Sequence, residues 1–265
     1  MTMIQGQLVV VRGAGDLATG VIIRLVNAGF RVIALETARP SAIRRTVSLC
    51  EAMYDGEARV EGVRAVRCAS APGSWAPGDP VAILDDPGCL SLAGLRPAAL
   101  VDAIIAKRNL GTRMDQAPVV VALGPGFEAG RDAHAVVETN RGHDLGRVLL
   151  SGSAEPNTGV PGLIAGHGRE RVLHAPRAGR VELLCAIGDQ VVAGAPMLSI
   201  QGDVVAAPIG GVVRGLIRPG FDAPAGMKVA DVDPRCEPAH CRSVSDKARA
   251  IAGGVLEALL MLGAP

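Results

Sequence analysis

The chain has few aromatic residues, and this limits what it can bind. Only 2% of its 265 residues are aromatic, namely one tryptophan, one tyrosine and three phenylalanines. Proteins that hold single-stranded nucleic acid rely on stacking the bases on such rings. Charge gives no compensation, because 27 Lys and Arg against 26 Asp and Glu leave a net charge of +1. A chain without a basic field does not attract nucleic acid or an anionic membrane, so neither is expected as a partner.

Long apolar runs and a targeting segment are also missing. No uninterrupted apolar stretch is long enough to cross a bilayer. The first strand is expected within about eight residues of the start, with no basic and apolar leader before it. Cysteines are not packed into a small disulfide framework but scattered along the chain, at Cys50, Cys68, Cys89, Cys185, Cys236 and Cys241. These features predict a protein of the reducing cytoplasm.

Glycine is abundant, and its first cluster directly follows a predicted strand. The β-branched run Leu8–Val11 is typical of a strand covered on both faces. Gly13, Gly15 and Ala18 then complete a G-x-G-x-x-A pattern, whose small residues allow a tight turn, a close pyrophosphate and close helix packing. A helix from about residue 17 to Gly29 would aim its N–H groups at a phosphate. The pattern predicts a Rossmann-type nucleotide-binding unit, or a βαβ unit that binds nothing.

An acidic residue at the end of the next strand supports nucleotide binding. The strand expected over 31–35 ends in Glu36, which lies 21 positions after Gly15. An acid about 20 residues after the glycines is where a ribose diol is hydrogen-bonded. Asp16 is the exception, since it places a negative charge beside the phosphate unless it only favours the helix start. Arg44 and Arg45 follow the strand and are candidates to clamp a phosphate or carboxylate, or they lie on a solvated helix start.

A second strand-to-glycine junction occurs at Gly124 and Gly126, after the apolar run 118–123. If 133–139 is a strand, His134 and Glu138 fall on one face of it by period-two spacing. Together with His143 they are the candidate catalytic residues. They are consistent with a metal site, with another polar ligand site, or with an ordinary surface strand and turn.

An internal repeat lies in the following segment. Ala175-Pro176, with Gly179, Val181, Gly188 and Gly194 after it, recurs 32 residues later at Ala207-Pro208, Gly211, Val213, Gly220 and Gly226. Two such copies of strands and turns resemble the biotinyl/lipoyl hybrid sandwich. The hairpin near residues 201–203 has no lysine, so a carrier function is not expected.

The predicted fold class is therefore α/β. It has a Rossmann-like domain with a parallel sheet over 1–165, a small all-β biotinyl/lipoyl-like (barrel-sandwich hybrid) domain over 170–235, and a C-terminal loop and helix over 236–265. Cys236, His240 and Cys241 in this loop are three soft ligands for a metal or belong to an ordinary loop, since the usual four-ligand zinc clasp is absent. The final helix, with Ser245 as its N-cap, either returns to the core or forms a homo-oligomer interface.

Motifs along nearly the whole chain resemble the YqeB family. They are Arg-Gly-Ala-Gly-Asp-Leu-Ala-Thr-Gly at 12–20, Arg-Arg-Thr-Val-Ser at 44–48, Gly-Pro-Gly-Phe-Glu-Ala-Gly-Arg-Asp-Ala-His at 124–134, Val-Glu-Thr-Asn-Arg-Gly-His-Asp-Leu-Gly-Arg at 137–147, Val-Ala-Asp-Val-Asp-Pro-Arg at 229–235 and Ser-Asp-Lys-Ala-Arg-Ala-Ile-Ala-Gly-Gly-Val-Leu-Glu-Ala at 245–258. Family members are described as accessory proteins of the selenium-dependent molybdenum hydroxylase system. The resemblance implies that the motif positions are candidate contacts: Gly13, Gly15, Asp16, Arg44, Arg45, Gly126, His134, Glu138, Arg141, His143, Asp231, Asp233, Arg235 and Lys247.

Three functions remain open from the sequence. The first is an accessory or maturation protein that serves a molybdenum hydroxylase or its other accessory proteins, and that binds a nucleotide-containing ligand such as molybdopterin dinucleotide. The second is an NAD(H)-dependent oxidoreductase, with His134 or His143 as proton donor. The third is a non-catalytic scaffold with no ligand. In the first two, Gly13, Gly15, Asp16, Ala18, Glu36, Arg44, Arg45, Gly124, Gly126 and Arg141 are the expected cofactor contacts.

Overall fold

The computed structural model describes residues 6–160 and 162–263, and the chain divides into two compact units. The first unit takes in the chain up to Pro40, Ser48–Thr158 and the chain from Val244 onward. The second unit consists of Ser41–Val47 and Gly159–Ser243. Each unit is therefore assembled from separate segments of the sequence.

A nine-stranded mixed sheet forms the centre of the first unit, with the strand order β10-β9-β7-β6-β1-β2-β5-β4-β3. Strands from β9 to β4 in this order run parallel, whereas β10 and β3 pair antiparallel at the two edges. The strands are β1 Leu8–Arg12, β2 Arg31–Glu36, β3 Glu57–Val60, β4 Val63–Cys68, β5 Val81–Asp85, β6 Ala99–Asp102, β7 Val119–Leu123, β9 Ala135–Val137 and β10 Val148–Leu149. A separate two-stranded sheet pairs β8 Glu128–Ala129 with β11 Gly152–Ser153.

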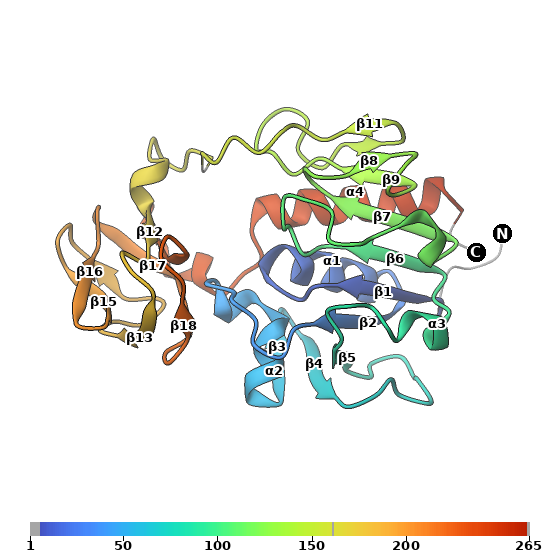
Figure 1. Cartoon of the computed structure of the whole chain (residues 1–265), viewed down its shortest axis with the longest axis horizontal. Helices are drawn as coiled ribbons and strands as arrows, with labels where there is room; N and C mark the ends of the chain where they lie inside the picture. Colours follow the sequence, from blue (N-terminus) through green and yellow to red (C-terminus); the bar gives the residue numbers. More distant parts are fainter. Residues whose placement is uncertain (1–5, 161, 264–265) are drawn as a thin grey trace. The chain divides into compact units, whose positions relative to one another are not determined.

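Two helices cover one face of the large sheet. Helix α1 (Asp16–Asn27) packs against β1 and β2, and α4 (Asp246–Met261) packs against α1, β7, β9 and β10. Figure 1 shows the two helices side by side behind the strands. Their close approach depends on the glycine at position 20, because a Cβ there would lie only 2.9 Å from the Cβ of Ala248. The C-terminal helix therefore returns to the core of the first unit.

Loops and short helical turns cover the opposite face. Buried side chains there include Cys89, Leu92 and Phe127, which pack with Val10 and Leu100 of the central strands. The helical pieces outside α1 and α4 are short: α2 Ala52–Asp55, α3 Leu92–Leu95, η2 Leu49–Glu51 and η3 Met114–Gln116. The parallel strands after β2 are thus connected mostly by loops and single turns.

These observations correct the predicted fold class of the first unit. A Rossmann-like domain with a parallel sheet requires crossover helices on both faces. This sheet is mixed, and within residues 6–160 only β1-α1-β2 has a full crossover helix. Residues 45–55, which follow β2, form only the short pieces η1, η2 and α2.

The second unit is built from two four-stranded antiparallel sheets with the orders β12-β19-β17-β14 and β16-β15-β13-β18. Its strands are β12 Val172–His174, β13 Gly179–Leu183, β14 Gln190–Val191, β15 Pro196–Ile200, β16 Asp203–Ala206, β17 Gly211–Leu216, β18 Asp222–Ala223 and β19 Lys228–Asp233. Three short helical turns belong to it as well, η1 Arg45–Val47, η4 Arg169–Arg171 and η5 Pro238–Cys241.

The prediction of a biotinyl/lipoyl-like domain is also corrected. The repeated Ala-Pro…Gly segments do form strands, β13 and β17, but these belong to a larger unit that incorporates residues 41–47 and the turns η4 and η5. Leu216 donates its N–H to the Ile43 carbonyl at 2.7 Å, so a segment distant in sequence completes this unit. A sequence repeat predicts local strands and turns, but it does not predict which segment, distant in sequence, packs with them.

Within the part of the chain that the structure describes, no helix is long and apolar enough to cross a membrane.

Candidate functional site

The carboxyl ends of β1, β6 and β7 lie next to one another at one edge of the large sheet. The next strand along the chain, β2, lies on one side of β1, and β6 lies on the other side, so the strand order reverses at β1. Ligands of open α/β sheets bind outside the carboxyl ends of the strands at such a reversal. We call this place the carboxyl-edge site; it comprises residues 13–16, 103–109, 124–127, 138–141 and 245–247.

The first glycine turn is tightly built, and the helix start beyond it is open. Gly13 has φ +103°, donates its N–H to the Leu35 carbonyl at 2.7 Å, and would bring a Cβ to 3.2 Å from the Ala103 carbonyl oxygen. Gly15 is the N-cap of α1, has no capping side chain, and a Cβ there would meet nothing within 4 Å. Ala18 is buried in the first turn, as close helix packing requires. There is thus open space beside Gly15 at the start of α1, where backbone N–H groups and the helix dipole favour an anion.

Glu36 binds the glycine turn itself. Its Oε2 accepts the N–H of Ala14 at 2.9 Å and its Oε1 accepts the N–H of Thr37 at 2.8 Å. Burial raises the pKa of this carboxyl, and the two backbone hydrogen bonds oppose the rise. The acid that the sequence assigned to a ribose thus holds the loop that precedes α1.

Replacing Glu36 by glutamine should lower the free energy of unfolding by about 1–2 kcal/mol, because a single amide oxygen cannot accept from both the Ala14 and the Thr37 N–H. Urea denaturation measures this change. Glu57→Gln is the matched control: its carboxylate pairs with Arg64 on an exposed edge strand. Equal effects of the two substitutions would contradict the role given to Glu36.

A lysine at the start of α4 is the central cation of the carboxyl-edge site. Burial lowers the pKa of Lys247, and the nearby charges of Arg141 and Lys107 lower it further, against the opposing effect of Asp16 and Glu138. These five groups therefore lie within electrostatic reach of one another. Asp16, which is half-buried in the first turn of α1, acts here as a counter-charge to the lysine.

Arg141 is held at the same helix start. It donates two hydrogen bonds to Asp246, at 2.6 and 3.1 Å. Ser245 caps α4 by accepting the N–H of Ala248 at 3.2 Å, as the sequence predicts. The N-termini of α1 and α4 thus both contribute to this edge, and α4 brings Lys247 with it.

The three candidate catalytic residues are not brought together. Glu138 is buried just after β9, where its oxygens accept the N–H groups of Asn140 and Glu155 at 2.6 and 2.7 Å. His134 precedes β9, at the opposite edge, and its Nδ1 accepts the N–H of Val120 at 3.0 Å. About four residues of strand, roughly 13 Å, separate them. His143 is exposed in the loop that follows.

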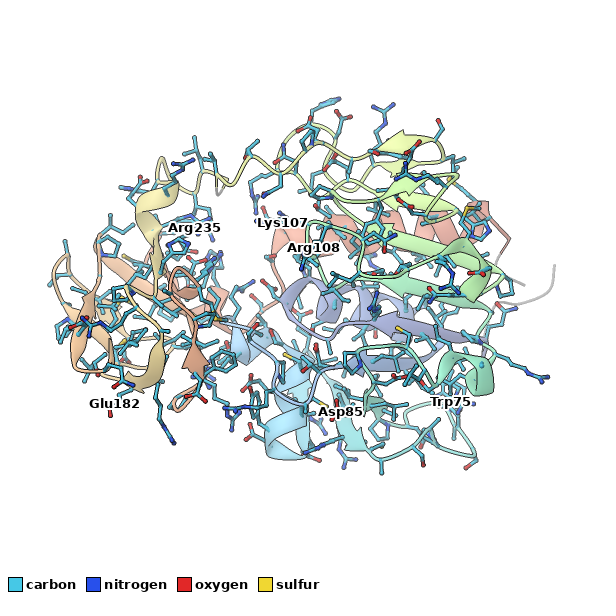
Figure 2. The ribbon with its side chains drawn as sticks, viewed as in Figure 1. Trp75, Asp85, Lys107, Arg108, Glu182 and Arg235 are labelled. Carbon is cyan, nitrogen blue, oxygen red and sulfur yellow. The ribbon has the colours of Figure 1, made fainter. Side chains whose placement is uncertain are left out.

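The second glycine junction serves the packing of a neighbouring loop. Gly126 has φ +101°, and a Cβ there would collide with the backbone of Arg108; one at Gly124 would collide with the side chain of Thr139. The loop that Gly126 admits has left-handed backbone at Ile105 (φ +59°) and Lys107 (φ +63°). Such conformations are unfavourable for a β-branched residue and are often found at functional sites. Figure 2 shows Lys107 and Arg108 at this end of the sheet.

A buried ion pair at the end of β1 is not predicted from the sequence. Arg12, the last residue of β1, donates to Asp102 at 3.3 Å and to Thr112 at 3.0 Å, and Thr112 donates to Asp102 at 2.6 Å. Its other nitrogen reaches the carbonyls of Pro87 and Leu110. A charged residue at the end of a buried strand was the only available signal, and its partners are 90 and 100 positions away. This network joins the loops that carry the site.

Arg44 and Arg45 belong to the second unit, where they bind backbone carbonyls. Arg44 is buried and donates to the carbonyls of His240 and Ser243, and Nε of Arg45 donates to the carbonyl of Leu216 at 2.8 Å. Both arginines therefore fix the segment 41–47 onto the second unit.

A dense charge network surrounds two buried aspartates of β19. Asp231 pairs with Arg171, Arg214 and Lys228, and Asp233 pairs with Arg214 and Arg235. Burial works against ionisation of both carboxyls, yet Lys228, Arg214 and Arg171 lower the pKa of Asp231. Hydrogen bonds from Arg235, with Arg214 nearby, lower the pKa of Asp233 to about 2.

The cysteine-bearing loop of the second unit separates its three soft side chains. Cys236 is exposed, whereas Cys241 is buried and its thiol lies 3.6 Å from the Val213 carbonyl. Burial raises the pKa of the Cys241 thiol. Across the described residues there is no group of three or more His, Cys, Asp or Glu side chains placed to hold a metal ion.

Comparison with known proteins gives one strong match in sequence. No family model matches the chain. An Escherichia coli (strain K12) protein described as "Uncharacterized protein YqeB" is 52% identical over 258 residues, which are 97% of this chain. The match covers 48% of that protein, so the chain spans about half the length of the curated relative it matches.

Solved structures give only weak matches. They include the ectoine utilization protein EutE (DoeB) from Ruegeria pomeroyi (14% identity, TM-score 0.24), a succinylglutamate desuccinylase from Silicibacter sp. TM1040 (12%, 0.26) and a succinylglutamate desuccinylase/aspartoacylase from Rhodobacter sphaeroides (16%, 0.28). Each alignment covers 86% of this chain and 85% of the other. Scores this low do not establish a shared fold. The sequence match alone supports assignment of this chain to the YqeB family.

Proposed function

We propose that the carboxyl-edge site binds the phosphate group of a nucleotide-containing ligand. The observation that carries this proposal is the open space beside Gly15 at the N-terminus of α1, with the partly buried Lys247 within electrostatic reach of Asp16 in the first turn of that helix. Backbone N–H groups and the helix dipole favour an anion at such a position. A phosphate also stabilises the protonated form of a lysine whose pKa burial has lowered.

The ligand we propose is the dinucleotide form of molybdopterin, and the role is that of an accessory protein in the maturation of a selenium-dependent molybdenum hydroxylase. This role rests on the family resemblance, and the 52% identity to YqeB supports the family. In this account the chain holds and delivers the cofactor, and the hydroxylase or another accessory protein is the partner that receives it. No catalytic step is required of the chain.

Binding to a panel of ligands tests the proposal. Purified protein is titrated by calorimetry with molybdopterin dinucleotide, molybdopterin, NADH and an unphosphorylated nucleoside. We expect the dinucleotide to bind at micromolar concentration and the nucleoside to bind at least about 10-fold more weakly, because it lacks the charged group. Absence of binding by every molybdopterin species at micromolar concentration would refute the proposed role.

An NAD(H)-dependent oxidoreductase is the second candidate, favoured by the glycine turn between β1 and α1. His134 lies at the other edge of the sheet, so among the two histidines only His143 is left as a proton donor near the nicotinamide. Tight NADH binding without molybdopterin binding would favour this candidate. A scaffold with no ligand is the account that remains if both fail.

A further inference from the structure

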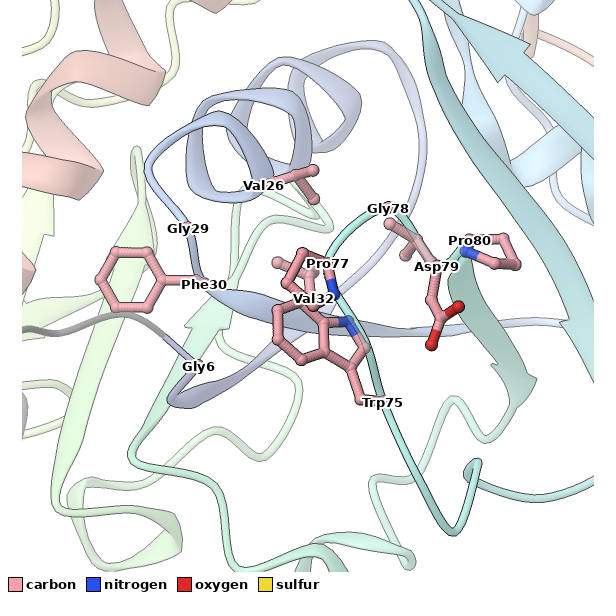
Figure 3. Close-up of a pocket in the computed structure, with 11 residues that line it drawn as sticks. Gly6, Val26, Gly29, Phe30, Val32, Trp75, Pro77, Gly78, Asp79 and Pro80 are labelled. Atoms are coloured by element: carbon pink, nitrogen blue, oxygen red, sulfur yellow. The ribbon is translucent and has the colours of Figure 1, made fainter.

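A cavity of about 440 Å³ lies at the amino-terminal edge of the large sheet, opposite the carboxyl-edge site. It is bounded by the end of α1, the starts of β2 and β5, and the loop 69–80 between β4 and β5. Its walls are mainly apolar and include Val26, Phe30, Val32, Trp75, Pro77 and Asp79. Figure 3 shows these side chains around the cavity, and Figure 2 shows Trp75 at the end of the sheet away from Lys107.

The loop that lines one side of the cavity has internal restraints of its own. It contains Pro72, Pro77 and Pro80, whose rings restrict the backbone. Asp79 Oδ2 accepts the N–H of Ala76 at 2.6 Å, and the Asp79 N–H donates to the Ala76 carbonyl at 3.1 Å. A Cβ at Gly78, which lines the cavity, would meet nothing within 4 Å, so the space is open there. A preformed cavity of this size is typical of a small-molecule site.

The side chains that line the cavity indicate which class of ligand it can bind. Trp75 offers a flat indole face with proline and valine around it, which suits a planar aromatic ring. Asp79 is the charged side chain of the lining, and only one of its oxygens is used by the loop. We propose that this cavity binds a planar aromatic or heteroaromatic cation, with the ring against Trp75 and an amidinium or amine on the Asp79 carboxylate. An anionic analogue is rejected.

This site is separate from the proposed phosphate site, since the two lie at opposite edges of the same sheet. It shares no residue with the carboxyl-edge site, so failure of nucleotide binding leaves the cavity untouched, and the reverse also holds.

Three probes of one shape and different charge test the proposal: benzamidine, benzamide and benzoate. Trp75 is the single tryptophan of the chain, so its emission reports occupation of the cavity directly. We expect saturable binding of benzamidine with a Kd of about 0.1–1 mM, as is usual for a fragment. Benzamide should bind about 5- to 10-fold more weakly, because it lacks the charge-assisted hydrogen bond, and benzoate should not saturate.

Two variants decide whether the signal comes from this cavity, with binding measured by calorimetry. Asp79→Asn keeps an oxygen for the Ala76 N–H and should bring benzamidine to the affinity of benzamide. Val26→Phe fills space in the cavity and should abolish binding of both benzamidine and benzamide. A full chain that binds none of the probes, that prefers benzoate, or that keeps its benzamidine affinity in both variants would overturn the proposal.

Discussion

Replacing Asp231 by alanine should lower the free energy of unfolding of the second unit by about 3–5 kcal/mol. Asp231 is 1% exposed and binds Arg171, Arg214 and Lys228. Its removal leaves these three cations with Asp233 as the one remaining carboxylate of the network. The large effect comes from the unpaired charges that remain, not from the strength of any one pair. Hydrogen exchange of the amides of β17 and β19 measures it, because the second unit contains neither tryptophan nor tyrosine.

Asp203→Ala is the matched control in the same unit. Asp203 pairs with Arg177 on the surface, where both side chains are about half exposed, so its loss should cost at most about 1 kcal/mol.

Acid should destabilise the charge network of β19 in the same direction as Asp231→Ala. The pKa of each aspartate is depressed in the folded state, so their contribution is complete above the unfolded value of about 4 and is lost as the pH falls below it, for Asp233 as the pH approaches about 2. Equal exchange rates in Asp231→Ala and Asp203→Ala would contradict this account.

The second large effect is expected for Asp102→Ala in the first unit, again about 3–5 kcal/mol. Asp102 is 2% exposed at the end of β6 and is the counter-ion of Arg12, which is 7% exposed. Without it the guanidinium and the Thr112 hydroxyl lose their shared acceptor, and the loops after β1 and β6 lose their common anchor. Urea unfolding followed by Trp75 emission measures the change.

Asp85→Ala is its control. Asp85 ends strand β5 at the same edge of the sheet, but its side chain is exposed, so a change within about 0.5 kcal/mol is expected. A loss in Asp85→Ala as large as that in Asp102→Ala would mean that the strand end, and not the buried pair, determines stability.

The local order of elements at the N-terminus could be predicted from the sequence. The structure confirms a strand at Leu8–Arg12, a helix from Asp16 and a strand ending at Glu36, because β-branched runs, glycine stops and helix periodicity are local signals. The same holds for the strand Val119–Leu123 and for the C-terminal helix with its Ser245 cap.

What could not be predicted depends on long-range packing. Glu36 was correctly placed at a strand end, but only the fold reveals that the Ala14 N–H occupies its carboxylate. His134 and Glu138 share a period-two pattern, yet β9 is only three residues long and leaves them beyond its opposite ends. Arg44 follows β2 closely in sequence, yet its segment joins the second unit. Neither periodicity nor motif spacing carries this information.

The central claim is that Lys247 binds the phosphate of a nucleotide-containing ligand, and a pair of lysine variants tests it most directly. Lys228 is the matched control, since it is also partly buried and its pKa is likewise lowered, first by burial and then by Arg171 and Arg214. The measurement is the Kd of molybdopterin dinucleotide for the full chain, Lys247→Met and Lys228→Met. The account predicts that Lys247→Met raises the Kd by about 10-fold or more, the loss of one charge-assisted contact, while Lys228→Met leaves it unchanged. An unchanged Kd in Lys247→Met, or a larger rise in Lys228→Met, would contradict it.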